Sequence, residues 1–245
     1  MPSTGEGGPR RVRAVVLALL MLGMPAPARA QSERDQSTTV STWTFDREPV
    51  GGLPRGWAGD GGVAGSVYSI ERERDGNAYL RASSHDDGVQ LGVEVQADAR
   101  NGLTLSWRWR VFEVPAGGDE RRVETMDSAA AVYAVFGSAL LPRVIKYVWS
   151  TTVPEGTVLR HPRSGRMAIV VIASGAERLG DWWAVRRDLS EDYRRLFGGE
   201  ADRLRAIGVK SDSDSTSGAA RADFDDFQLL EGQPREPSRR GGQRD

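Results

Sequence analysis

Hydrophobic and polar residues alternate most regularly between residues 103 and 111, in the segment LTLSWRWRV. Side chains of a strand point alternately to its two faces, so Trp107 and Trp109 would share one face with the apolar Leu103, Leu105 and Val111. Arg108 and Arg110 would share the other face with Thr104 and Ser106. Five apolar residues at alternate positions of a nine-residue segment predict a strand. We expect its apolar face, including both tryptophans, to lie in the core.

Further segments with strand character follow along the chain, and turns rich in glycine, proline or aspartate separate many of them. They are residues 41–45, 66–72, 78–83, 89–95, 130–136, 144–150, 167–173, 182–188, 205–210 and 222–229. One segment predicts a helix, SEDYRRLF at residues 190–197, which begins with a capping serine and acidic residues and stops at two glycines. Many strands without alternating helices predict an all-β protein, an antiparallel β-sandwich with one short helix.

The first 30 residues carry the pattern of a secretory signal peptide. Arg10, Arg11 and Arg13 precede an apolar run at residues 14–24, and Ala28-Arg29-Ala30 fits the usual cleavage motif. We therefore expect export, with the mature protein in the periplasm or outside the cell and no transmembrane segment in it. Residues 31–41 read as a polar linker, residues 42–230 as one domain, and residues 231–245 as a disordered tail.

Composition excludes several classes of site. The chain has no cysteine and two histidines, so disulfides, thiol nucleophiles, cysteine-type zinc sites and three-histidine metal sites are ruled out. The formal charge is −1, and removal of residues 1–30 would take away four arginines and one glutamate and leave −4. Such a charge argues against a nucleic-acid partner.

Tryptophans and arginines form the first candidate ligand-binding group. Trp182 and Trp183 are adjacent, so in a strand they point to opposite faces and one of them would be exposed for stacking on a sugar ring. Arg108 and Arg110 would bring two guanidinium groups together, which suits carboxylates or phosphates if their sheet face lines a groove. Ordinary ion pairs on a solvated face are the alternative.

Acidic residues form the second candidate group: Asp119, Glu120, Asp127, Asp212 and Asp214. If the protein were a polysaccharide lyase or glycoside hydrolase, it would act through the Arg108 and Arg110 face and the loop with Asp119, Glu120 and Asp127, and two of the carboxylates would serve as acid and base. Asp212-Ser-Asp-Ser-Thr216 begins like an EF-hand calcium loop, but Ser217 stands where that loop needs glycine and Asp223 where it needs glutamate. An EF-hand is excluded, whereas another kind of loop calcium site stays open.

Several segments together resemble a known family. They include SWRWRV at residues 106–111, VYAVF at 132–136, IKYVW at 145–149, SDSDST at 211–216 and ADFDDF at 222–227. Their order and spacing are similar to an exported bacterial family catalogued as domain of unknown function 3047, over roughly residues 42–230. That resemblance implies family membership and no particular activity.

A looser resemblance is to jelly-roll carbohydrate-binding modules. It rests on the opening segment TWTFD, which ends at Asp46, and on the closing segment FDDFQL at residues 224–229. The resemblance implies a jelly-roll topology and a structural calcium ion held by Asp46, Asp225 and Asp226. From it we expect a non-catalytic binding protein for a carbohydrate or cell-envelope glycan. The alternatives are the lyase or hydrolase above and a module that binds envelope proteins.

Overall fold

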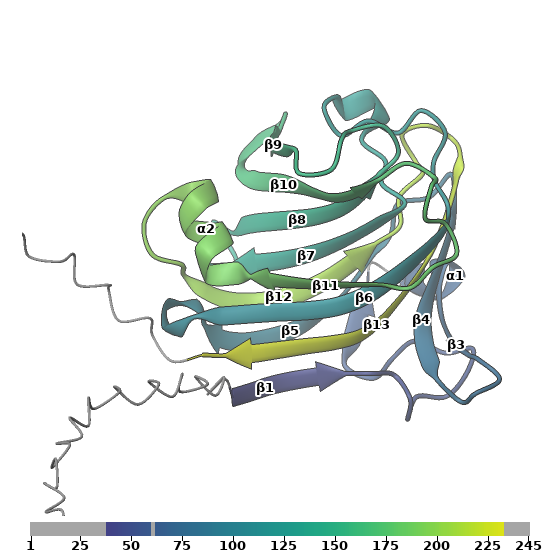
Figure 1. Cartoon of the computed structure of the whole chain (residues 1–245), viewed down its shortest axis with the longest axis horizontal. Helices are drawn as coiled ribbons and strands as arrows, with labels where there is room; N and C mark the ends of the chain where they lie inside the picture. The colour runs from purple at the N-terminus through teal and green to yellow at the C-terminus, as the bar shows by residue number, and fades with distance from the viewer. Residues whose placement is uncertain (1–37, 60–61, 233–245) are drawn as a thin grey trace, which may run out of the picture. The chain divides into compact units, whose positions relative to one another are not determined.

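The computed structural model describes residues 38–59 and 62–232, and the predicted signal peptide and most of the tail lie outside this part of the chain. The strands of the described part form two sheets (Figure 1). Sheet A runs in the order β11-β6-β13-β4-β3, with β1 also paired to β13. Its strands are β1 (Thr38–Trp43), β3 (Tyr68–Arg72), β4 (Ala78–His85), β6 (Leu103–Glu113), β11 (Trp183–Asp188) and β13 (Ala219–Glu231).

Sheet B runs in the order β2-β5-β12-β7-β8-β10-β9. Its strands are β2 (Trp57–Gly59), β5 (Gln90–Asp98), β7 (Ala130–Phe136), β8 (Arg143–Ser150), β9 (Val158–His161), β10 (Ser164–Ser174) and β12 (Arg203–Lys210). Every pair in the two sheets is antiparallel except β8 with β10, which is parallel. The architecture is the predicted β-sandwich of jelly-roll type, and this parallel pair departs from a purely antiparallel pattern.

The core lies between the sheets and is built by the alternation seen in β6. Leu103, Leu105, Trp107, Trp109 and Val111 are all buried, as the period of two predicts. Aromatic rings join the sheets, because Trp107 contacts Tyr147 of β8 at 5.5 Å between ring centroids and Trp109 contacts Trp149 at 6.2 Å. Such aromatic pairs contribute about 0.5–1.5 kcal/mol each beyond the area they bury.

Helix α2 (Leu189–Phe197) lies at one end of the strands (Figure 1). Its capping residue is Asp188, whose side chain accepts a hydrogen bond from the Glu191 amide, two positions before the serine that the sequence suggests. The helix is tied to the sheets through the buried Asp192, which accepts bonds from Tyr147 of β8 and Arg187 of β11. The other helices are short: α1 (Ala64–Val67), η2 (Ala99–Asn101) and η3 (Val123–Thr125).

The boundaries of the domain differ from the prediction by a few residues. β1 begins at Thr38, so residues 38–41 belong to sheet A rather than to a linker. β13 extends to Glu231, which pairs with both Thr38 and Leu103. The polar composition of residues 38–41 conceals the strand because β1 lies at a solvated edge. Within residues 38–59 and 62–232, no helix has the length and apolar character needed to cross a membrane.

Candidate functional site

A row of polar residues crosses four strands on the outer face of sheet A, the face away from the core. Thr42 of β1 pairs with Gln228 of β13, Gln228 pairs with Ser106 of β6, and Ser106 pairs with Arg186 of β11. Directly paired residues of neighbouring strands point to the same face. The pairing therefore collects hydroxyl, amide and guanidinium groups from segments as far apart as residues 42 and 228.

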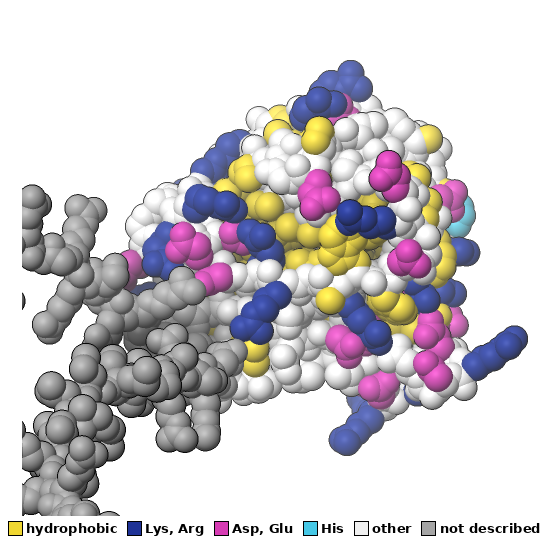
Figure 2. Space-filling model, in the orientation of Figure 1, with side chains coloured by type: hydrophobic (Ala, Val, Ile, Leu, Met, Phe, Trp, Pro, Cys, Tyr) yellow, Lys and Arg dark blue, Asp and Glu magenta, His cyan; other side chains and the backbone are white. Residues whose placement is uncertain are grey.

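This row lies in a pocket of about 440 Å³, which we call the sheet A groove. That volume falls in the usual range of small-ligand sites, roughly 300–1,000 Å³. The groove is lined by Thr42, Thr44, Ser106, Trp107, Arg108, Ala184, Val185, Arg186, Asp226 and Gln228. In Figure 2 the surface over β6, β13 and β1 is mostly white, since few hydrophobic or charged side chains cover it.

Arg108 borders the groove and is held by acidic residues of β13. Its Nη2 donates to Asp225 Oδ2 at 2.7 Å and to Asn77 Oδ1 at 2.9 Å, and its Nε lies 2.8 Å from Asp226 Oδ2. Two consecutive aspartates reach one arginine because β13 is irregular between Asp225 and Gln228, where Asp226 has a φ of 51°. A β-bulge of this kind changes the direction of side chains along a strand.

A second row, next to the groove, is an ion-paired layer. The fully buried carboxylate of Asp223 accepts hydrogen bonds from Arg81 of β4 and Arg110 of β6, at 2.7–3.1 Å. Arg110 also pairs with Glu73 at 2.8 Å. Asp223 points outward and is nevertheless buried, because the two guanidinium groups cover it. The layer therefore adjoins the groove, and both of the predicted arginines, Arg108 and Arg110, have acidic partners.

The Trp182 ring packs against Arg110 of this ion-paired layer and against Arg108. The guanidinium carbons of Arg108 and Arg110 are 4.6 and 4.4 Å from the centre of its ring, and Tyr79 makes an edge contact at 5.8 Å. These contacts position the ring. The side chain is half-buried, so part of it is accessible beside the groove.

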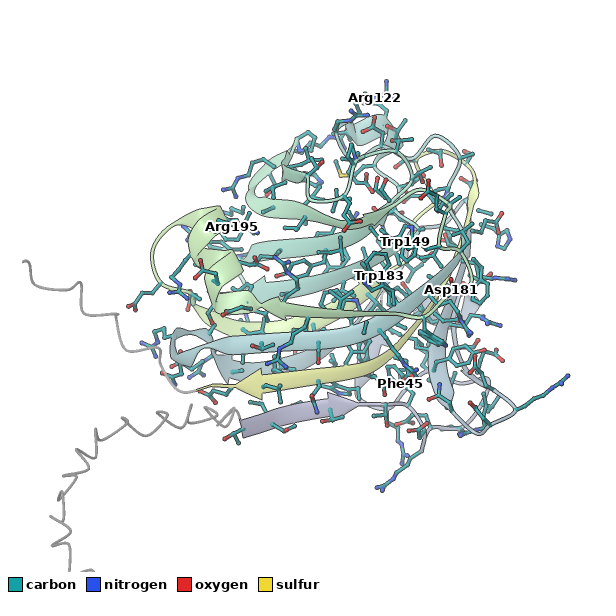
Figure 3. The ribbon with its side chains drawn as sticks, viewed as in Figure 1. Phe45, Arg122, Trp149, Asp181, Trp183 and Arg195 are labelled. Carbon is teal, nitrogen blue, oxygen red and sulfur yellow. The ribbon has the colours of Figure 1, made fainter. Side chains whose placement is uncertain are left out.

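Trp183 lies on the other side of β11, as predicted for adjacent residues of a strand. It pairs with Trp109, packs against the core and contacts Trp149 at 5.9 Å between ring centroids, as the labels in Figure 3 help to locate. It too is half-buried, with the Arg178 guanidinium 4.0 Å from its ring centre. Figure 2 shows a band of hydrophobic side chains over β8, β10 and β11. Trp182 thus lies beside the sheet A groove, whereas Trp183 lies at the hydrophobic band.

Burial changes the proton affinity of two groups near the groove. Burial raises the pKa of Asp225 to about 6, against the opposing effect of its hydrogen bonds from Arg108 and Asn77. Burial also raises the pKa of Tyr79, with the Asp223 charge acting in the same direction. Asp225 is therefore mostly ionised at neutral pH and protonates within an easily accessible pH range.

The predicted acidic residues do not line the groove. Asp119 pairs with Arg121 at 2.7 Å, and this pairing holds the pKa of Asp119 below its usual value. Glu120 is fully buried and accepts hydrogen bonds from Ser128 and Ser150. The structure therefore does not bring Asp119 or Glu120 together with the arginine pair in one cleft.

Asp127, Asp212 and Asp214, in contrast, are brought together elsewhere. One carboxylate oxygen from each lies within 4.8 Å of the others, although residues 127 and 212 are far apart in the sequence. Asp127 and Asp212 are buried and Asp214 is exposed. Burial raises the pKa of Asp212 to about 6, while nearby Lys210 and Lys146 lower it.

The predicted calcium ligands Asp46, Asp225 and Asp226 already have other partners. Asp46 accepts a hydrogen bond from the Ala78 amide at 3.1 Å, and Arg108 pairs with both Asp225 and Asp226. These three aspartates do not form a close carboxylate group among the residues that the structure describes. The cationic Arg108 is thus the partner that the structure shows for two of these three aspartates.

Sequence reasoning missed most of the groove. Thr42, Ser106, Gln228 and Arg186 are common surface residues, and what distinguishes them is their register across four strands. Sequence reasoning also missed Tyr79, which contacts Trp182. The alternation in β6 places Ser106 and Arg108 on one face, but no local signal shows which residues of β1, β11 and β13 stand beside them.

Comparisons with solved structures find distant β-sandwich proteins. A structure reported for the promiscuous specificity of carbohydrate-binding modules shares 15% identity at a TM-score of 0.38, over 80% of this chain and 62% of that one. The K1 cleaved adhesin domain of Lys-gingipain from Porphyromonas gingivalis W83 shares 12% at 0.37, over 78% and 97%. TmCBM27, a mannan-recognising module, shares 12% at 0.36, over 80% and 98%. This chain thus spans less than two thirds of the first structure, and such scores support no statement about function.

No curated protein matches the sequence. A protein-family model does match, that of a family described as "Protein of unknown function (DUF3047)", over residues 56–228. The matched region begins just before β2 and ends within β13, so it contains most of both sheets and of the core. The chain therefore belongs to the DUF3047 family.

Proposed function

We propose that the protein binds carbohydrate, without catalysis, in the sheet A groove. The observation that carries this proposal is the half-buried Trp182, held by Arg108 and Arg110 beside a groove of hydroxyl, amide and charged side chains. A pyranose has an apolar face, which stacks on an aromatic ring, and a rim of hydroxyl groups that need hydrogen-bond partners. An aromatic ring next to a few fixed polar groups is suited to such a ligand.

The charges around the groove favour a neutral polysaccharide. Arg108 is paired with Asp225 and Asp226, so its charge is matched by nearby carboxylates. Arg110 is paired with Asp223 and Glu73 in the adjoining layer. A uronic acid would have to compete with these carboxylates for the guanidinium groups. We therefore expect weaker binding of acidic polysaccharides than of neutral ones.

The arrangement of carboxylates favours binding over hydrolysis or elimination. A glycoside hydrolase needs two carboxyl groups on either side of the scissile bond. Among the residues that line the groove, Asp226 has the one carboxylate, and it is paired with Arg108. The other proposed participants, Asp119, Glu120 and Asp127, are bound to groups outside the groove.

A second candidate function, binding of another envelope protein, is favoured by the hydrophobic band near Trp183 (Figure 2). Exposed apolar surface of sufficient area marks interaction sites. Both proposals include export, which rests on the signal-peptide pattern of residues 1–30. The two surfaces lie on opposite sides of β11, so one variant on each side separates them.

The test is binding of the purified protein to soluble mannan, xylan and galactan and to acidic polygalacturonate and alginate. Affinity electrophoresis would measure binding, and a reducing-sugar assay would measure released product. We expect retardation by at least one neutral polysaccharide, no product, and an affinity that changes less than twofold between 50 and about 300 mM salt, since ion pairing with the ligand contributes little. Product release would overturn the non-catalytic assignment, and retention by acidic polymers alone would overturn the choice of ligand.

Paired variants locate the binding surface. We expect Trp182→Ala to weaken binding by at least tenfold, and Gln228→Ala by severalfold. Gln96→Ala is the matched control, because Gln96 is an exposed glutamine of β5 in the other sheet. Binding that survives Trp182→Ala but is lost in Trp183→Ala would move the ligand to the hydrophobic band and refute the groove.

A further inference from the structure

Three connections between the two sheets meet at the end of the sandwich away from α2. Asp127 lies in the β6–β7 connection, whereas Asp212 and Asp214 lie in the β12–β13 connection, and the two connections run side by side in Figure 1. Gly88 comes from the β4–β5 connection. The three carboxylates approach within 4.8 Å, which is the separation of two oxygens on opposite sides of one ion at about 2.4 Å.

One carboxylate oxygen in this cluster is buried without a hydrogen-bond partner. Asp212 is 5% exposed, and its Oδ2 accepts from Lys210 Nζ at 2.6 Å. Its Oδ1 is buried and has no partner. A buried acceptor left unsatisfied costs about 1–3 kcal/mol, and more when it is charged. Asp212 Oδ1 and Asp214 Oδ2 both lie within 2.6 Å of the position that a Cβ of Gly88 would take, so a cation bound between these carboxylates would satisfy Oδ1.

Asp127 is held in place independently of any ion. Its carboxylate accepts hydrogen bonds from the amides of Ser215 and Thr216, at 3.1 and 2.7 Å, and from the Thr216 hydroxyl at 2.6 Å. The residues that follow Asp214 therefore fold over Asp127. This loop conformation fixes the distance between carboxylates that come from two different connections, so the cluster is pre-organised.

The backbone at Gly88, in the β4–β5 connection, lies very close to the carboxylates of Asp212 and Asp214. A Cβ at this position would lie 2.4 Å from Asp214 Oδ2 and 2.6 Å from Asp212 Oδ1, well inside contact distance. Two carboxylate oxygens thus point at the same stretch of backbone. No side chain larger than hydrogen fits between the backbone and these oxygens.

The charges near the cluster do not cancel. Lys210 is paired with Asp212, and Lys146 is buried and bonded to Ser128, which also donates to Glu120. Four carboxylates thus face two ammonium groups, a net charge of −2 when every group is ionised. They are Asp127, Asp212, Asp214 and Glu120 against Lys146 and Lys210. One divalent cation would balance this charge.

We propose that Asp127, Asp212 and Asp214 bind one calcium ion. Three carboxylates supply the hard oxygen ligands that Ca²⁺ prefers, and Ca²⁺ accepts the irregular geometry of ligands from separate loops, whereas Mg²⁺ requires a near-ideal octahedron. The ion links β12 of sheet B and β13 of sheet A through their shared connection and joins it to the β6–β7 connection. Its role is structural, and the site is separate from the sheet A groove.

The test uses the whole purified chain after treatment with a chelator and removal of the chelator. Calorimetric titration with CaCl₂ should give one ion per chain, and differential scanning fluorimetry should show a higher Tm. A saturating excess of about 100 times the Kd should raise Tm by roughly 5–10 °C for a protein of this size. Absence of heat and of any Tm shift at millimolar Ca²⁺ would overturn the proposal, as would equal affinity for Mg²⁺.

Variants establish where the ion binds. Asp214→Asn should weaken Ca²⁺ binding at least tenfold without loss of the fold, because Asp214 is exposed. Asp212→Asn should abolish the Tm shift, and circular dichroism would confirm that it is folded. Asp181→Asn is the matched control, since Asp181 is exposed and lies beside β11 (Figure 3). Binding that is unchanged in both Asp212→Asn and Asp214→Asn would place the ion elsewhere and overturn the assignment.

Discussion

The ion-paired layer around Asp223 allows the strongest test of how the outer face of sheet A is stabilised. This carboxylate is fully buried although it points away from the core, and Arg81 and Arg110 cover it from the two neighbouring strands. Arg81 donates to both carboxylate oxygens at 2.9 and 3.1 Å, and Arg110 donates twice to Oδ2 at 3.1 and 2.7 Å. Because either arginine alone still neutralises Asp223, the two arginines should not contribute independently to stability.

The structure gives the expected magnitude. Hydrogen bonds to charged groups contribute about 1.5–3 kcal/mol, and the partial exposure of the arginines, 28% for Arg81 and 13% for Arg110, reduces this value. Arg81→Leu or Arg110→Leu alone should therefore cost about 2 kcal/mol of the free energy of unfolding. The double variant leaves a buried, unpaired carboxylate, which costs roughly 3–5 kcal/mol beyond the lost packing. We expect a total near 6 kcal/mol.

Urea denaturation of the wild type, both single variants and the double variant forms a double-mutant cycle. The expected coupling is about 2 kcal/mol, with the double variant less stable than additivity predicts. Adding Asp223→Leu to the double variant removes the unpaired charge and should recover most of the loss. Additive costs, or a triple variant no more stable than the double, would refute the idea that the arginines act by neutralising Asp223.

Three other predictions concern the titration of Asp225, the core and the signal peptide. Burial raises the pKa of Asp225 to about 6, so this carboxyl group binds a proton more tightly in the folded protein than in the unfolded chain. The stability that the protonated group contributes is therefore lost as the pH rises from about 4 to about 6. The stability of wild type relative to Asp225→Asn should therefore decrease by about 2 kcal/mol from pH 4 to pH 7 in urea melts, and a flat difference would contradict the shift. Trp109→Ala should cost about 4 kcal/mol in the same assay, because Trp109 is fully buried between the sheets, and a cost under 1 kcal/mol would contradict that placement. N-terminal sequencing of the protein exported by a bacterial host should give Gln31 as its first residue, and an intact N-terminus would refute the signal peptide.

The sequence predicts the strands well because burial on one face leaves a strong local pattern. In β6, the buried and half-buried positions alternate through the residues that the period of two assigns to the core and to the outer face. The segments missed are β2 and β9, with three and four residues, which are too short for alternation to be recognised. Residues 38–41 resemble a linker in sequence because edge strands carry polar residues.

The candidate sites were harder to predict, because they depend on pairing between distant strands. Trp182 and Trp183 separate to opposite sides of β11 as the alternation predicts. For Arg108, in contrast, the sequence leaves a ligand site or ordinary ion pairs open, and the structure shows ion pairs, because a bulge in β13 brings two aspartates to it. A bulge shifts register by one residue, and no composition rule locates it.

The two proposed sites use acidic residues in opposite ways, and the difference lies in how many cations the chain itself supplies. On the outer face of sheet A, Asp223 has two arginines, and Asp225 shares Arg108 with the exposed Asp226. Each of these aspartates has an arginine partner within the protein, so we expect the neighbouring groove to select ligands by shape and hydroxyl groups. At the loop cluster, Lys210 matches only one oxygen of Asp212, and the other oxygen is buried without a partner. Because a buried charge is stable only when it is paired, we expect the second site to take an ion from solution, whereas the first does not need one.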